Sequence, residues 1–177
     1  PKPIKFKVKR YIGGLSQFKK IDNPIKLSAN ESALGPSPKA IQAFEDDKNN
    51  ISKYPESDSE SLREVLSKKF NIDPKRIICG SGSDQIFDFT CHLFLKPEDE
   101  VIVTEFGFIM HRIYASLHNA KVILAKEKNF KASVEEILKK VTNKTKIVFI
   151  ANPNNPTGTY ISKNEMLNLR KKLRSDI

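Results

Sequence analysis

Continuous apolar runs alternate with helix-like apolar spacing along most of this chain. Four runs predict buried strands, at residues 76–79, 101–103, 122–124 and 147–150. Around them, apolar residues recur every three or four positions, which predicts helices near residues 38–44, 62–70, 86–94, 110–117, 137–141 and 166–173. This alternation predicts an α/β fold with a mainly parallel sheet and helices on both faces.

Serine residues mark where several of these helices are expected to begin. Ser37 precedes Pro38, and proline is favoured in the first turn of a helix. The capping-box spacing, in which Ser is followed three positions later by Glu, occurs at residues 61–64, 133–136 and 162–165. Each of these serines is expected to accept a hydrogen bond from the first turn of its helix.

The net charge of +10 lies at the two ends of the chain. Residues 1–26 hold eight Lys or Arg and one acid, or +7, and residues 163–177 hold five and two, or +3, so residues 27–162 are neutral. A nucleic-acid-binding face would carry its basic residues on the folded part, so nucleic acid is not expected as a partner. Residues 1–26 read as an extended arm that either packs on a partner subunit or is disordered.

Cysteine and histidine usage argues against a metal site and against a disulfide. Cys79 and Cys91 lie in apolar contexts, as the reduced, buried thiols of a cytoplasmic protein do. The cysteines and the three histidines lack the spacing of metal ligands. The apolar runs are too short to cross a bilayer, so no membrane association is expected.

A glycine-rich turn, Gly80–Asp84, leads from a predicted strand directly into a helix. Glycines let a backbone approach a ligand closely, and free amides at a helix start favour a phosphate. The turn lacks both the dinucleotide-binding glycine pattern and the lysine of a P-loop. It is also typical of a purely structural connection, and on its own it leaves both interpretations open.

The loop Asn152–Gly158 (NPNNPTG) follows the last predicted strand. Its two prolines cannot belong to a central strand, so the segment must leave the sheet as an irregular turn. Its three asparagines place amide groups at the carboxyl end of a strand, where open α/β sheets bind their ligands. Phe106 follows another strand at the same predicted edge, where it could stack on a planar ligand or pack into the core.

The three histidines are weak catalytic candidates. His92, His111 and His118 all fall within predicted helices, and no acid lies at a useful spacing to pair with them. No Ser/His/Asp set can be assembled. The residues thus predict a phosphate-binding turn, an aromatic platform and amide donors at one sheet edge, which suits a flat, phosphorylated cofactor.

With these segments in place, the chain resembles the histidinol-phosphate aminotransferases, which are pyridoxal-phosphate enzymes of the aspartate aminotransferase fold. The matching segments, in the family's order, are residues 27–31 (LSANE), 34–38 (LGPSP), 54–56 (YPE), 82–84 (GSD), 106–108 (FGF) and 152–158 (NPNNPTG). They extend over roughly residues 10–177. The resemblance implies a partial pyridoxal-phosphate-binding large domain over residues 37–177, after an arm and substrate-side loop over residues 1–36. It also implies that the family's small carboxyl-terminal domain is absent.

The resemblance implies a role for each matching residue toward pyridoxal 5'-phosphate. The turn at Gly82, with the amides of Ser83 and Asp84, would hold the phosphate. Phe106 would stack on the pyridine ring and Asn155 would donate to its phenolic oxygen. Two further residues are implied outside that group: Tyr54 would reach the phosphate in the partner subunit of a homodimer, and Gly35 would approach the substrate.

The family's catalytic lysine and the aspartate that binds the ring nitrogen have no counterpart in this sequence. We therefore assign no catalytic residue within the chain. The resemblance implies an enzyme that passes an amino group between glutamate/2-oxoglutarate and histidinol phosphate/imidazole-acetol phosphate in histidine biosynthesis. An aromatic-amino-acid aminotransferase, a threonine-phosphate decarboxylase and, from another class, a non-catalytic phosphate- or cofactor-binding module remain alternatives.

The purified 177-residue chain is expected to show no transaminase activity, because pyridoxal chemistry requires a positioned amine and this chain offers none. Incubation with pyridoxal phosphate, histidinol phosphate and 2-oxoglutarate, followed by assay for glutamate, checks this. Turnover above that of the free cofactor would contradict it.

Overall fold

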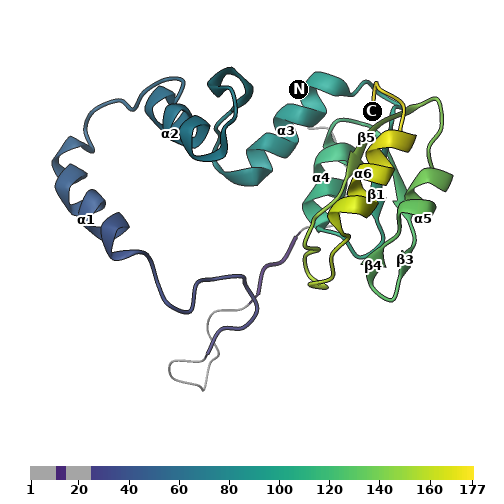
Figure 1. Ribbon diagram of the computed structural model, residues 1–177, viewed down its shortest axis with the longest axis horizontal. Helices are drawn as coiled ribbons and strands as arrows, with labels where there is room; N and C mark the ends of the chain where they lie inside the picture. The colour runs from purple at the N-terminus through teal and green to yellow at the C-terminus, as the bar shows by residue number, and fades with distance from the viewer. Residues whose placement is uncertain (1–10, 15–24) are drawn as a thin grey trace, which may run out of the picture. The chain divides into compact units, whose positions relative to one another are not determined.

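The computed structural model describes residues 11–14 and 25–177, so most of the basic arm expected over residues 1–26 lies outside the described residues. The chain divides into two compact units. We call Ile12–Cys79 the helical unit, and the unit that contains Gly80–Ile177 the sheet unit (Figure 1). In the described parts of both, no helix is long and apolar enough to cross a membrane.

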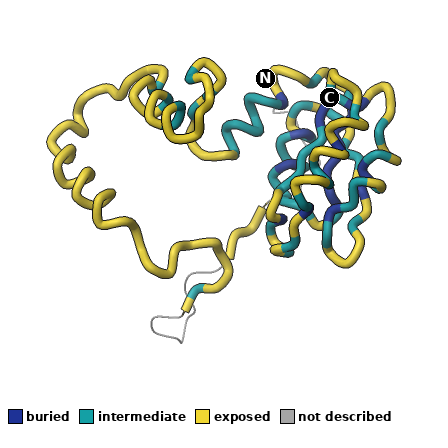
Figure 2. The backbone as a smooth tube through the Cα atoms, viewed as in Figure 1, coloured by how far each residue is buried: buried dark blue, intermediate teal, exposed yellow. Residues whose placement is uncertain are grey.

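The helical unit consists of short helices joined by loops. Its elements are α1 (Pro38–Asp47), η1 (Lys48–Asn50), α2 (Glu60–Phe70) and η2 (Pro74–Arg76). The Arg63 guanidinium joins the last two, donating to the carbonyl oxygen of Pro74 from Nε at 3.1 Å and from Nη2 at 2.9 Å. None of the described residues of this unit is buried, and apolar side chains such as Phe44 are largely exposed (Figure 2).

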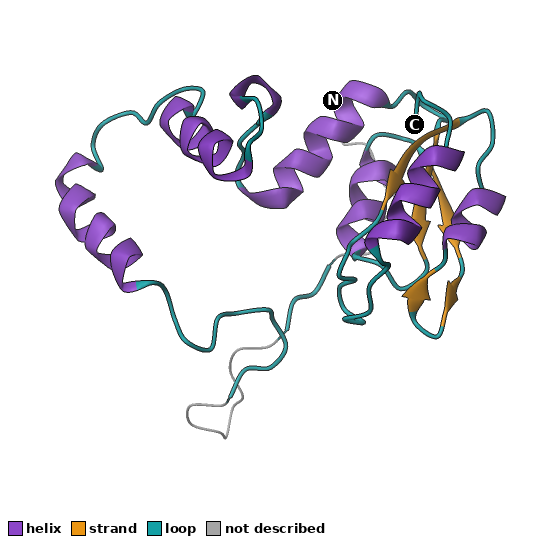
Figure 3. Ribbon diagram, in the orientation of Figure 1, coloured by secondary structure: helices purple, strands orange, loops and turns teal. Residues whose placement is uncertain are grey.

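The sheet unit is built on three parallel strands in the order β2-β1-β5 (Figure 3). These are β1 (Glu100–Thr104), β2 (Lys121–Ala125) and β5 (Thr145–Phe149). In the central strand all five residues are buried, and Ile102 pairs with Ile123 on one side and Val148 on the other. A two-stranded hairpin, β3 (Glu127–Lys128) and β4 (Lys131–Ala132), follows β2.

Helices cover the sheet on both faces because alternate residues of β1 point in opposite directions. On one face Val101 and Val103 pack with Ala115 of α4 (Ile109–Leu117), which lies beside α3 (Gly82–Phe94). On the other face Ile102 packs with residues of α5 (Val134–Lys139) and α6 (Lys163–Lys172). The predicted α/β class, with helices on both faces of a parallel sheet, is confirmed.

One predicted strand is absent from the structure. Residues 77–79 are not in a strand, and the side chain of Ile78 is 64% exposed. A strand exists only through hydrogen bonds to a neighbour. The described residues offer this apolar run no such neighbour, since both sheets form without it.

The capping predictions hold at two of four serines. Ser37 does precede α1, with proline in the first turn, but its side chain makes no capping bond. Ser162 and Glu165 form a full capping box, in which Oγ of Ser162 accepts the Glu165 amide at 3.2 Å and Glu165 accepts the Ser162 amide at 2.7 Å. Ser133 likewise accepts the Glu136 amide, at 3.4 Å. At Ser61 the prediction is wrong, because helix α2 already begins at Glu60 and the Ser61 hydroxyl donates to Glu56 instead.

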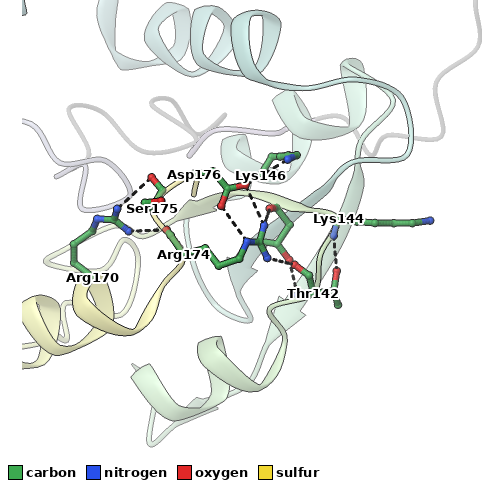
Figure 4. Close-up of polar contacts among 8 residues, drawn as sticks. Thr142, Lys144, Lys146, Arg170, Arg174, Ser175 and Asp176 are labelled. Carbon is green, nitrogen blue, oxygen red and sulfur yellow. Dashed lines mark hydrogen bonds and ion pairs between the residues drawn. The ribbon is translucent and has the colours of Figure 1, made fainter.

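Arg174 fixes the carboxyl end of α6 to the start of β5 (Figure 4). Its guanidinium donates to the carbonyl oxygens of Thr142 and Thr145, the latter at 2.9 Å, and its Nε donates to Asp176 at 3.0 Å. Asp176 also lies 3.5 Å from the ammonium of Lys146 on β5. Helix α6 is therefore held at both ends, by its capping box and by Arg174.

Strand β5 is one of the two edge strands of the three-stranded sheet, and an apolar groove lies beside it. The groove is lined mainly by Val148, Ile150, Met166, Leu169, Leu173 and Ile177. Apolar side chains along an unpaired edge favour association with another polypeptide.

The Ile102→Ala variant is expected to lower the free energy of unfolding of the sheet unit by about 3–4 kcal/mol, because Ile102 is fully buried at the centre of the sheet. Leu167→Ala, at a half-exposed position of α6, is the matched control and should cost less than about 1 kcal/mol. Urea unfolding followed by circular dichroism measures both. Equal losses would mean that the sheet is not the core of this unit.

Candidate functional site

The carboxyl ends of β1, β2 and β5 meet at one edge of the sheet because the strands are parallel and adjacent. The segments that leave this edge are residues 105–108, 126–127 and 150–161. Open α/β sheets bind ligands at this edge, so these three segments define the candidate site.

The glycine-rich turn provides backbone amides at the start of α3. Gly82 is the first residue of α3 and has φ +80°, a backbone conformation that residues with a side chain rarely adopt. The space where a Cβ would stand is open. Its N-cap, Ser81, makes no side-chain capping bond, and the Ser81 amide donates to Gln85 Oε1 at 2.6 Å. The amides of Ser83 and Asp84 have no carbonyl partner within the helix, so they are suited to an anion.

Aromatic packing brings α3 to the site. The ring of Phe87, about one turn into the helix, lies 6.3 Å from that of Phe108 and 5.7 Å from that of Phe149. Phe108 follows β1 and Phe149 ends β5, so the first turn of α3 lies toward the carboxyl edge of the sheet. The predicted phosphate-binding turn and the strand ends therefore belong to one part of the sheet unit.

Phe106 presents its ring at this edge and is 42% exposed. Its ring centroid lies 5.3 Å from that of Phe130, at the tip of the β3–β4 hairpin, with a tilt of 51°. Its amide donates to Glu127 Oε1 at 3.1 Å. The next residue is Gly107, where a Cβ would collide with the Thr104 hydroxyl, so the backbone here requires glycine. Phe106 is thus a half-exposed ring on a fixed backbone, as a stacking platform requires.

The three asparagines of the loop after β5 have different surroundings. Asn152 pairs with the backbone of Ile161, accepting its amide at 2.9 Å and donating to its carbonyl at 3.1 Å. Asn154 is 5% exposed and donates to Thr157 Oγ1 at 2.9 Å. The half-buried Asn155 makes no side-chain hydrogen bond to any described residue. Two asparagines therefore build the loop, and Asn155 is left able to bind a ligand.

Glu127 is the site residue that sequence reasoning missed. It follows β2 and accepts hydrogen bonds from Phe106 and, at 3.5 Å, from the Asn154 amide group. The available signal was its position, since a charged residue just beyond a buried strand falls at the ligand-binding edge. Its partners are 21 and 27 residues away, so no local spacing reveals the contacts.

Two predicted site residues lie in the helical unit. Tyr54 is fully exposed there, and Gly35 occupies a turn with φ +72°. Each is described only within that unit, and their roles toward cofactor and substrate stay predictions.

The histidines take part in aromatic packing and in one hydrogen bond to a carboxylate. His118 Nε2 lies 2.8 Å from Asp88 Oδ1, so the expectation that no acid pairs with a histidine is wrong. The two residues are 30 positions apart and meet because α3 packs on α4. His111 is buried and stacks on Phe149 with centroids 4.9 Å apart, and burial lowers its pKa to about 4. No histidine contacts the candidate site's asparagines.

A wide pocket between the hairpin, α5 and α6 is rich in charge. Its ammonium groups are largely neutralised, since Lys128 lies 2.8 Å from Glu135 and Lys131 lies 3.0 Å from Glu165. Hydrogen bonds from Lys128 and then Lys139 lower the pKa of Glu135 to about 2. These are solvated ion pairs. Within the described residues no cluster of His, Cys, Asp or Glu could hold a metal ion.

The arrangement at the sheet edge fits a flat, phosphorylated ligand. Free amides at a helix start can bind the phosphate, the Phe106 ring can cover one face, and the Asn155 amide can donate to a polar ring substituent.

Residues 22–175 match the family model described as aminotransferase class I and II. The match includes the glycine-rich turn, Phe106 and the asparagine loop.

Among curated proteins, the chain is similar to the histidinol-phosphate aminotransferases of two bacteria. It is 57% identical over 177 residues to that of Pelagibacter ubique and 42% identical over 177 residues to that of Paramagnetospirillum magneticum. In both cases the match covers all of this chain and 49% of the relative. The chain therefore spans about half the length of these curated relatives.

Among solved structures, the fold resembles the histidinol-phosphate aminotransferase of Sinorhizobium meliloti in complex with pyridoxal-5'-phosphate. The TM-score is 0.79 at 22% identity, over 82% of this chain and 40% of that one. The aspartate aminotransferase of Rhizobium meliloti gives a TM-score of 0.75 at 22% identity, over 82% and 39%. At these identities the comparison establishes the fold alone.

The His111→Phe variant is expected to flatten the pH dependence of stability. Because the folded pKa of about 4 lies below the ordinary histidine value of 6.5, the unfolded chain binds a proton between these values and the folded chain does not. Stability of the original chain should therefore rise with pH across this window, by at most about 1.4 kcal/mol per pH unit from this group. Urea unfolding of both proteins from pH 4 to 7 tests it. Parallel profiles would contradict it.

Proposed function

The chain belongs to the class I and II aminotransferase family, and from this we propose that it supplies the cofactor-binding part of a histidinol-phosphate aminotransferase. The observation that carries the proposal is the identity of 57% to the Pelagibacter ubique protein of that name, which extends over all 177 residues. Because the chain spans about half of that relative, the activity proposed is that of the whole polypeptide.

The proposed cofactor is pyridoxal 5'-phosphate, held by residues at the sheet edge. Its phosphate would accept hydrogen bonds from the amides of Ser83 and Asp84, in the turn that Gly82 permits. The ring would lie against Phe106, and the side chain of Asn155 would donate to its phenolic oxygen. The uncommitted amide of Asn155 and the half-exposed ring of Phe106 support this arrangement.

Bound pyridoxal phosphate supplies an aldehyde that exchanges amino groups and a ring that accepts an electron pair. The residues of this chain position it. Phe106 fixes the plane of the ring and keeps water from one face, while Asn155 favours the negative form of the phenolic oxygen. The α3 dipole and the first-turn amides offset the charge of the phosphate. The lysine and aspartate that the reaction needs have no counterpart among these residues.

In the proposed reaction the amino group of glutamate passes to imidazole-acetol phosphate, which gives 2-oxoglutarate and histidinol phosphate. The reverse reaction passes the amino group from histidinol phosphate to 2-oxoglutarate. Tyr54 would bind the cofactor phosphate in the partner subunit of a homodimer, and Gly35 would approach the substrate. A biosynthetic role of this kind agrees with a cytoplasmic location and with small-molecule substrates.

A chimera in which this chain replaces the matched residues of the Pelagibacter ubique relative tests the proposal. The chimera is expected to bind pyridoxal phosphate and to form glutamate from histidinol phosphate and 2-oxoglutarate. A chimera that folds and binds the cofactor but prefers an aromatic amino acid, or decarboxylates threonine phosphate, would overturn the proposed substrate. A folded chimera that binds no cofactor would overturn the proposed site.

Within that chimera, Asn155→Ala is expected to lower kcat/KM for histidinol phosphate by about 10- to 100-fold, because one charge-assisted hydrogen bond to the cofactor is lost. Asn164→Ala, on the exposed face of α6, is the matched control and should stay within about twofold. Steady-state kinetics measure both. Equal kcat/KM values for the two variants would show that Asn155 does not bind the cofactor.

A further inference from the structure

Glu127 connects the two loops that carry the proposed cofactor ligands. Its Oε1 accepts the Phe106 amide at 3.1 Å and is 3.5 Å from Asn154 Nδ2. Phe106 belongs to the loop after β1, and Asn154 directly precedes Asn155 in the loop after β5. One carboxylate that follows β2 therefore bridges segments from the other two strands.

Further hydrogen bonds fix the backbone around this carboxylate. The Glu127 amide donates to Glu105 Oε2 at 3.5 Å, and the Glu105 amide donates to the Ala125 carbonyl at 3.0 Å. The Arg112 guanidinium donates to the carbonyl oxygens of Thr104 and Glu105. The segment before Phe106 is thus held to the end of β2, and Glu127 holds Phe106 itself.

The hairpin that begins at Glu127 contacts the same two loops a second time, at its tip. Phe130 there has φ +59°, a conformation that costs energy for an aromatic residue. Its carbonyl accepts the Thr159 hydroxyl at 2.6 Å, and its ring packs on Phe106. The base of the hairpin therefore holds the backbone of Phe106, and its tip backs the ring.

Two buried oxygens in this cluster have no partner among the described residues: Glu127 Oε2 and Asn154 Oδ1. A buried acceptor without a donor costs stability, so an apolar pair of the same shape would be the more stable choice. The partly unpaired Glu127 carboxylate is therefore better explained by the groups that it orients, the Phe106 amide and Asn154, than by a contribution to the stability of the fold.

We propose that Glu127 is a positioning residue, which holds the Phe106 ring and the Asn155 amide at a fixed separation from each other at the cofactor site. The inference rests on the proposed function, and it assigns no contact between Glu127 and the cofactor. The carboxylate acts through the Phe106 amide on one loop and through Asn154 on the other.

The test uses the chimera described above with Glu127→Leu and Glu127→Gln. Leucine keeps the size and removes the acceptor, whereas glutamine keeps one acceptor oxygen for the Phe106 amide and loses the charge. Glu127→Leu is expected to raise the Kd for pyridoxal phosphate by about tenfold or more, and Glu127→Gln by about threefold. Glu135→Gln, which alters an exposed ion-paired carboxylate on α5, is the matched control and should leave the Kd unchanged.

Hydrogen–deuterium exchange of the cofactor-free proteins separates positioning from general stability. In Glu127→Leu, exchange is expected to rise in the peptides over residues 105–108 and 152–159 together, while β1 and α6 stay protected. A uniform rise across the sheet unit, or a rise in one loop alone, would overturn the proposal. So would an unchanged Kd for Glu127→Leu in a folded protein.

The outcomes also separate this inference from the proposed function. If the unaltered chimera binds no cofactor, the proposed function fails, and the exchange data still report whether Glu127 couples the two loops. If the unaltered chimera is active and the Glu127 variants match it in Kd and exchange, the proposed function stands and the positioning role fails.

Discussion

The burial of β1 is the constraint on which the rest of the sheet unit depends. All five of its residues are removed from solvent, so its amides and carbonyls need partners on both sides. Strands β2 and β5 provide these partners in parallel register. The apolar side chains on the two faces of the sheet then pack against helices. Because parallel strands end at the same edge, the polar segments that follow them are brought together.

At that edge, the polar residues divide into those that hold the loops and those left for a ligand. The side chains that hold the loops are those of Asn152, Asn154 and Glu127. They form hydrogen bonds with backbone and side-chain groups of the loops at this edge. Phe106 and Asn155 keep an exposed ring and an uncommitted amide. A rigid support beneath a small number of available groups is the arrangement that positions a cofactor with little loss of entropy on binding.

The sequence predicted those parts of the fold that depend on local pattern. Apolar runs identified all three strands of the parallel sheet, and the Ser162–Glu165 spacing identified a true capping box. The run at residues 76–79 was misassigned because a strand depends on a neighbour that pattern cannot supply. The glycine-rich turn and the asparagine loop could also be predicted, because the residues that define each of them are consecutive in the sequence. Contacts such as Glu127 with Phe106, or His118 with Asp88, join distant positions and became visible only in three dimensions.

The reciprocal pairing of Asn152 with Ile161 has a consequence for how this loop can evolve. The pairing closes the loop into a ring, β5 fixes one end, and the doubly anchored α6 fixes the other. Within such a ring a substitution that keeps the Asn152 pairing leaves the backbone in place, but an added or deleted residue displaces every group that follows it. Among homologous chains, length variation should therefore avoid residues 152–161 and accumulate in loops that lack such closure.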